Sequence, residues 1–67
     1  MADVFRVHEV ARVRLGKYAG MVGTVTETRQ DGAGKQTGVR VLIDGVSDGE
    51  PIYVERWFKR SEVERNQ

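Results

Sequence analysis

The sequence predicts an all-β fold: a small barrel, closed or partly closed, of five short strands with a short helical turn before the last strand. Apolar and polar residues alternate with a period of two along most of the chain, as they do in half-buried strands. Turns that contain glycine separate the alternating runs, and no segment has the spacing of an amphipathic helix. This combination is typical of small β-barrels.

The first half of the chain predicts two strands joined by a glycine loop. Within residues 5–15, Phe5, Val7, Ala11, Val13 and Leu15 share one parity, and the basic residues and His8 share the other, which suits a half-buried strand. A second strand is expected over residues 22–29, which are rich in Val and Thr. Residues 31–38 then form a polar, glycine-rich loop.

The second half predicts three more strands. Residues 39–43 form the third, with Val39, Val41 and Ile43 facing the core, and the pairs at residues 44–45 and 48–49, both Asp-Gly, mark the next turn. Pro51 opens a fourth strand over residues 52–55. Residues 57–64 predict a helical turn and the last strand. The OB-fold is the alternative, but residues 44–50 are too short for the helix it commonly inserts there.

At 67 residues the chain predicts a single domain, residues 1–67, with its core over about residues 8–64. It has no cysteine, and no segment has the length of a membrane span or the pattern of a secretion signal. We therefore expect a cytoplasmic protein with no membrane partner. Eleven basic and ten acidic residues give a net charge of +1, so binding to phosphates requires a local basic patch.

The glycines of residues 11–25 have a physical role. Gly16 and Gly20 are expected to bracket a tight loop, and Gly23 marks a bulge or a sharp bend in the returning strand. This run resembles the KOW motif of ribosomal proteins and NusG-type elongation factors. The matching residues are Ala11, Val13, Gly16, Tyr18, Ala19, Gly20, Gly23 and Val25. The resemblance implies an SH3-like barrel whose loop contacts RNA or a protein, a role carried over to Lys17 and Tyr18.

The sequence offers no set of residues for catalysis, a cofactor or a metal. Gly34-Lys35 lacks the further glycine, the Ser or Thr and the helix of a phosphate-binding P-loop. Residues 44–55 match a calcium loop at some positions, but Val46 replaces a ligand and strands flank the segment. His8 is the only histidine and has no cysteine to accompany it. We expect a binding protein with no catalytic residue, cofactor or small-molecule substrate.

What remains is a set of basic and aromatic residues able to bind phosphates and stack on bases, as single-stranded or loop RNA requires. The candidates are Arg12, Arg14, Lys17, Tyr18, Arg40, Trp57, Lys59 and Arg60, with Arg56 beside them. In the alternative interpretation the arginines pair with cross-strand acids such as Glu27 and Glu55, and the aromatic rings close the core. Two functions remain open: an RNA-binding or nucleoprotein-binding module, and a protein-interaction module or accessory subunit. The loop favours the first, and the near-neutral charge favours the second.

Overall fold

The computed structural model describes residues 4–66, which form one antiparallel sheet of five strands. Its elements are β1 (Val10–Val13), β2 (Val22–Gln30), β3 (Gln36–Ser47), β4 (Glu50–Lys59), the 3₁₀ turn η1 (Arg60–Glu62) and β5 (Val63–Arg65). The predicted all-β class, the five strands and the helical turn before the last strand are confirmed. Within the described residues no helix is long and apolar enough to cross a membrane.

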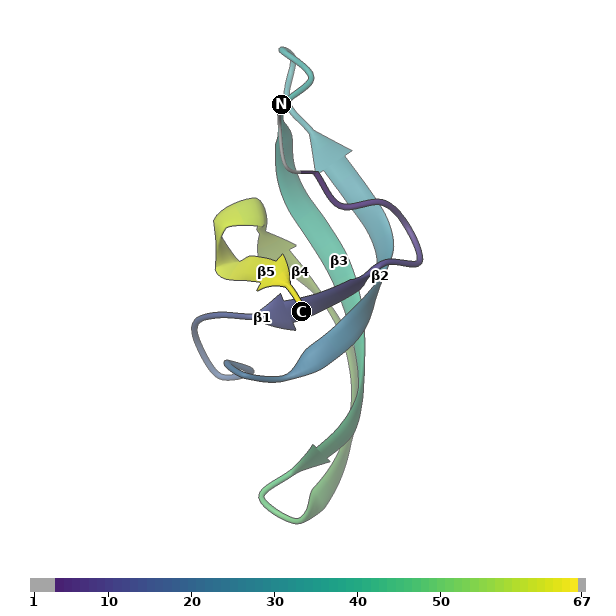
Figure 1. Cartoon of the computed structure of the whole chain (residues 1–67), viewed down its shortest axis with the longest axis vertical. Coiled ribbons are helices and arrows are strands. Elements are labelled where there is room, and N and C mark those ends of the chain that lie inside the picture. Colours follow the sequence, from purple (N-terminus) through teal and green to yellow (C-terminus); the bar gives the residue numbers. More distant parts are fainter. Residues whose placement is uncertain (1–3, 67) are drawn as a thin grey trace.

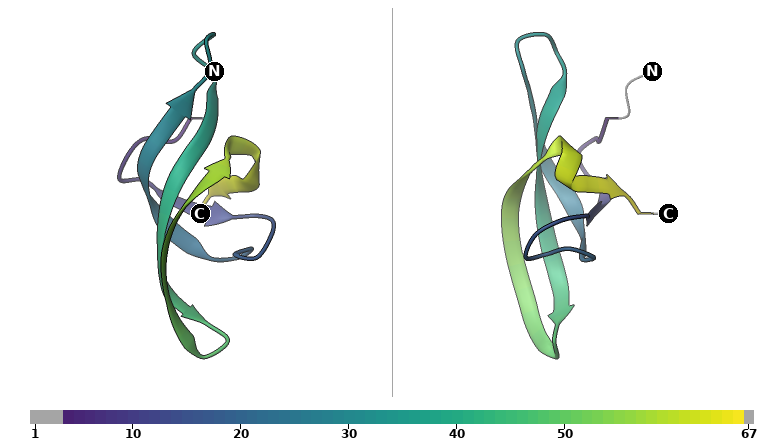
Figure 2. Two further views of the ribbon diagram at one scale, coloured as in Figure 1. Left: turned by 180° about the vertical axis from the view of Figure 1, so that it is seen from behind. Right: turned by 90° about the vertical axis from the view of Figure 1, so that its left-hand side faces the viewer.

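The strand order is β4-β3-β2-β1-β5, so β4 and β5 form the two edges of the sheet (Figure 1). Among residues 4–66 no ladder joins β4 to β5, and hydrogen bonding therefore leaves the sheet open instead of closing it as a barrel. The sheet is strongly curved, and the β3–β4 hairpin extends beyond the other strands at one end (Figures 1 and 2).

The core lies on one face of the curved sheet and is built mainly from β-branched side chains. Val39, Val41 and Ile43 are fully buried on β3, as their alternation predicts. The other buried apolar residues are Phe5, Ala11, Val13, Tyr18, Val25 and Val63. Each strand except β4 contributes at least one of these residues, while β4 packs Ile52, Val54 and Phe58 against the cluster.

The loop between β1 and β2 turns at two glycines. Gly16 has a φ of 86° and Gly20 a φ of 87°, values that side chains disfavour. The Gly20 N–H donates to the Val13 carbonyl at 2.7 Å, which closes the loop. Gly23 serves another purpose, because a Cβ there would stand 2.4 Å from the Leu42 carbonyl oxygen of β3. Close approach of two backbones, and not torsion, requires glycine at this position.

The β3–β4 hairpin is longer than the sequence predicts. Only Asp48 and Gly49 form its turn, with φ values of 52° and 79°, the positive pair of a type I′ turn. Asp44-Gly45, which was expected to mark the turn, lies within β3 and pairs with β4. The expected loop at residues 31–38 is shorter than predicted, because β3 already begins at Gln36.

The single strand predicted within residues 5–15 is wrong. Residues 6–9 form a turn in which His8 has a φ of 82°, so β1 begins only at Val10 and the parity is broken. Val7 and Leu15, expected in the core, are 43% and 56% exposed. Phe5 is buried, and the core therefore extends beyond the predicted lower bound at residue 8.

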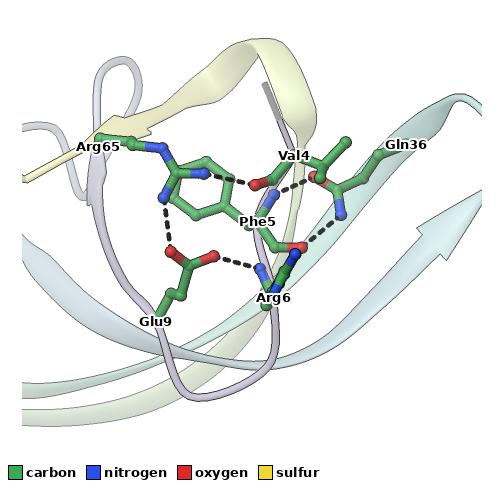
Figure 3. A network of polar contacts seen from close by, with 6 residues as sticks. All are labelled: Val4, Phe5, Arg6, Glu9, Gln36 and Arg65. Atoms are coloured by element: carbon green, nitrogen blue, oxygen red, sulfur yellow. Dashed lines mark hydrogen bonds and ion pairs between the residues drawn. The ribbon is translucent and has the colours of Figure 1, made fainter. Parts of the chain in front are cut away.

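A side chain from β3 holds the Phe5 segment in place. The Gln36 amide accepts from the Phe5 N–H and donates to the Phe5 carbonyl, both at 2.9 Å, as a neighbouring strand would do (Figure 3). The Arg65 guanidinium lies over the Phe5 ring at 4.9 Å and donates to the Val4 carbonyl and to Glu9. These contacts join the N-terminal segment to β3 through Gln36 and to β5 through Arg65.

Candidate nucleic-acid interface

Trp57 lies on the surface of the sheet, at the end of β4. Its ring covers Gly38 of the neighbouring strand, with Cε3 3.6 Å from the position of a Cβ on that glycine. The Arg29 guanidinium stacks on the ring at 4.4 Å from its centroid. With 38% of the residue exposed, Trp57 offers ring surface to a ligand. The sequence left open whether Trp57 is a core residue or a platform, and the structure places it at the surface.

Tyr18 and Phe58 take the core positions instead. Phe58 packs against the core, and its ring meets that of Tyr18 edge to face, with centroids 6.3 Å apart. Tyr18 lines the hollow beside the β1–β2 loop but is only 9% exposed, so it offers little ring surface for a base to stack on. The neighbouring Lys17 is exposed and carries its ammonium 5.7 Å from the Tyr18 centroid.

Three hollows lie around the C-terminal part of β4 and share lining residues. We call them together the basic furrow. One hollow lies between the β1–β2 loop and β4, and Trp57, Phe58 and Glu62 also line the next hollow. That second hollow shares Thr37 and Lys59 with a third, which reaches Lys35 and η1. The cations that line the furrow are Lys17, Arg29, Lys35, Arg56, Lys59 and Arg60.

Most of these cations form no ion pair with an acid in the part of the chain that the structure describes. Within residues 4–66 no carboxylate forms an ion pair with five of them, which are Lys17, Arg29, Lys35, Arg56 and Lys59. Glu62 is the acid that lines the furrow, and its Oε1 accepts from the Lys59 N–H at 2.8 Å. The furrow therefore concentrates positive charge in a chain that is almost neutral overall.

Arg60 differs from the other cations of the furrow because its guanidinium has a structural position. It lies 4.6 Å from the centroid of the Phe5 ring and donates to the Val63 carbonyl at 3.1 Å. Arg60 therefore contributes positive charge to the furrow from a side chain that Phe5 and Val63 hold in place.

The three remaining basic candidates, Arg12, Arg14 and Arg40, do not line the furrow. Arg12 and Arg14 both pair with Glu64 of β5, at 3.7 and 3.5 Å. Arg40 lies between Glu27 and Glu55, at 3.4 and 3.3 Å. These contacts are those of the alternative interpretation, a solvated face with cross-strand ion pairs.

The structure thus brings together five residues of the predicted set, with Arg56 beside them as the sequence suggested. The five are Lys17, Tyr18, Trp57, Lys59 and Arg60. Sequence reasoning missed Arg29 as a candidate and considered Lys35 only for a P-loop. The position of Arg29 follows from the pairing of β2 with β3, which sets it opposite Gly38. The missed signal was Gly38 itself, since a glycine in a strand often marks a surface that a large side chain covers.

The described residues hold no cluster of three or more His, Cys, Asp or Glu side chains that could bind a metal ion. The pKa of one acid, Glu9, is clearly displaced. The hydrogen bond from the Arg6 N–H lowers the pKa of Glu9 most, and the hydrogen bond from Arg65 lowers it further. Glu9 belongs to the contacts of Figure 3 and does not line the furrow.

Comparisons of the chain with protein-family models, with curated proteins and with solved structures found no match.

Proposed function

We propose that the chain is a non-catalytic, KOW-type module with an SH3-like architecture that binds single-stranded or loop RNA in its basic furrow. The observation that carries the proposal is the furrow itself, where Lys17, Arg29, Lys35, Arg56 and Lys59, none of them in an ion pair within residues 4–66, flank an exposed indole ring. Lys and Arg side chains neutralise phosphates, and an aromatic face accepts any base.

The ion pairs of the basic residues support the choice of the furrow as the binding surface. Among the residues that the structure describes, a phosphate that binds Lys35 or Lys59 displaces no ion pair, whereas Arg12 and Arg40 must share or release a carboxylate. The Arg29 guanidinium is already stacked on the Trp57 ring, which holds the partly exposed indole in place beside the cations of the furrow. The furrow is thus partly organised before a ligand arrives.

A protein-interaction module without RNA binding is the second candidate. Tyr53 and Val46, on the β3–β4 hairpin, are 71% and 68% exposed. Exposed aromatic and aliphatic side chains near each other are typical of protein contacts.

Fluorescence anisotropy with labelled, mixed-sequence single-stranded RNA tests the proposal. We expect binding at low salt that weakens steeply as salt rises. The double variant Lys35→Gln/Lys59→Gln removes two furrow cations. It should bind more weakly and flatten the dependence of log affinity on log salt by about 1.4, since each phosphate contact of a single strand contributes about 0.7.

The matched control is Arg12→Gln/Arg14→Gln, which removes the same charge from the paired face and should bind nearly as well as the parent. Trp57→Leu keeps Gly38 covered but removes the indole, and it should weaken binding by about 1–3 kcal/mol. If the parent does not bind RNA at low salt, or if the control loses as much affinity as the furrow variant, the proposal fails and the protein-interaction function takes its place.

A further inference from the structure

The edge strand β4 has a free side along the projecting part of the β3–β4 hairpin. Among the described residues, the backbone of residues 50–58 bonds to β3 and to no other segment. In Figure 1 the β3–β4 hairpin extends past β1, β2 and β5, so no other strand covers this edge. An exposed edge of this kind is a template for another strand.

The type of the β3–β4 turn determines which backbone groups of β4 point to the free edge. Across a two-residue type I′ turn, Ser47 and Glu50 exchange hydrogen bonds, and bonded and non-bonded pairs then alternate along the ladder. Pro51, which has no N–H, falls on a non-bonded pair, as it must. By the same alternation the N–H and C=O groups of Tyr53 and Glu55 point outward, away from β3.

The sequence of β4 is complementary to itself when it runs antiparallel. An acid, Glu50, opens the strand, apolar residues fill its middle, and Arg56 follows. A two-fold axis at Tyr53 places Glu50 opposite Arg56 of the second copy and Ile52 opposite Val54, each pair on one face of the sheet. Opposite charges and apolar side chains at such positions stabilise a sheet.

We infer that two copies of this chain associate through β4, antiparallel about a two-fold axis at Tyr53, and so form one continuous sheet. Each Tyr53 N–H donates to the Tyr53 carbonyl of the other copy, and each Glu55 N–H donates to the opposite Pro51 carbonyl. The two Tyr53 side chains, which are 71% exposed in the single chain, then pack side by side.

The charges of β4 favour this register over the registers that are shifted along the strand. An axis at Val54 sets Glu50 opposite Phe58 and loses the ion pair. An axis at Glu55 sets two carboxylates directly opposite each other, which destabilises the pairing. The dimer and the furrow share Arg56, but the inference does not depend on RNA binding, since it rests on the hairpin edge and needs no ligand in the furrow.

The first test uses nucleic-acid-free protein in sedimentation equilibrium up to roughly 1 mM, because an interface built on one strand is small and of the weakly associating kind. We expect a monomer–dimer equilibrium. Amide exchange by NMR at low and high concentration should then show protection that grows at Tyr53 and Glu55. The amides of Ile52 and Val54 are the internal control, since both already bond to β3.

A charge-exchange experiment tests the register. Glu50→Lys sets two cations opposite each other in a homodimer, and Arg56→Glu sets two anions opposite each other, so each variant alone should be monomeric where the parent dimerises. An equimolar mixture of the two variants restores both ion pairs and should form heterodimers. Circular dichroism confirms that each variant is folded.

A parent that stays monomeric at 1 mM overturns the inference, as does a dimer whose Tyr53 and Glu55 amides gain no protection. Dimerisation of the single variants as strong as that of the parent, or no heterodimer in the mixture, overturns the assigned register.

Discussion

Gly23→Ala tests the reason for the glycine in β2. The new Cβ would stand 2.4 Å from the Leu42 carbonyl oxygen and 2.6 Å from Val41 Cγ1. The first of these is a backbone atom in a central strand, so β3 must move to make room. Overpacking of this kind costs roughly 1–3 kcal/mol and occasionally more, and we expect about 3 kcal/mol.

That cost is large for a chain of 67 residues, whose total stability we expect to be about 3–10 kcal/mol. At about 4–8 °C for each kcal/mol, the melting temperature should fall by about 12–24 °C. Thermal unfolding followed by far-ultraviolet circular dichroism, with urea titration for the free energy, measures the loss.

Two other glycines supply controls that separate a steric clash of the new Cβ from an unfavourable backbone φ angle. At Gly20 a Cβ meets nothing within 4 Å, but φ is 87°, so Gly20→Ala should cost about 1 kcal/mol of backbone strain. Gly45 has open space and no positive φ, and Gly45→Ala should be neutral or slightly stabilising. If Gly23→Ala is no more destabilising than Gly20→Ala, the close-approach argument is refuted.

The remaining predictions concern the contacts of Figure 3 and the absence of ligand chemistry. Gln36→Met keeps the length of the side chain but removes both hydrogen bonds to Phe5, and urea titration should show a loss of about 2 kcal/mol; an unchanged free energy of unfolding would contradict this. Because the Arg6 N–H and Arg65 lower the pKa of Glu9 below its ordinary 4.5, folding favours the carboxylate. Its stabilisation is complete above that value and is lost as the pH falls through the lowered pKa, so Glu9→Gln should lose less melting temperature on acidification than the parent. Equal slopes in the two proteins would disprove a role for this carboxylate. Zinc, calcium and magnesium-ATP should each leave the melting temperature of the parent unchanged, and a rise with any of them would reveal a site for that ligand.

The central strands could be predicted from the sequence because each buries one face, which leaves a clear alternation. Val39, Val41 and Ile43 are the best example, and they line the core as expected. Alternation failed at the N-terminal segment because a turn at His8 changes the parity, and no pattern of hydropathy shows a change of φ. The burial of Phe5 depends on Gln36, a polar residue 31 positions away, whose amide replaces a strand.

The candidate site was only partly predictable, because a cation's availability depends on its neighbours across the sheet. Arg14 and Lys17 look alike in the sequence, yet Arg14 pairs with Glu64 and Lys17 has no ion pair within the described chain. Tyr18 and Trp57 are likewise two aromatic residues beside basic ones. The pairing of β3 with β4 places Trp57 over a glycine at the surface, and the fold of the β1–β2 loop buries Tyr18.

The pairing of β1 with β5 has a consequence for how the chain folds as it is made. Ala11 lies opposite Arg65 and Val13 opposite Val63, so the earliest strand shares a ladder with the latest. The hairpins between β2, β3 and β4 join neighbours in sequence and can form as they emerge from the ribosome, whereas β1 keeps one edge bare until residues 63–65 are synthesised. Contacts of such large sequence separation slow folding. The final step is therefore expected to wait until residues 63–65 have emerged, when Val63 comes to lie opposite Val13 and completes the core.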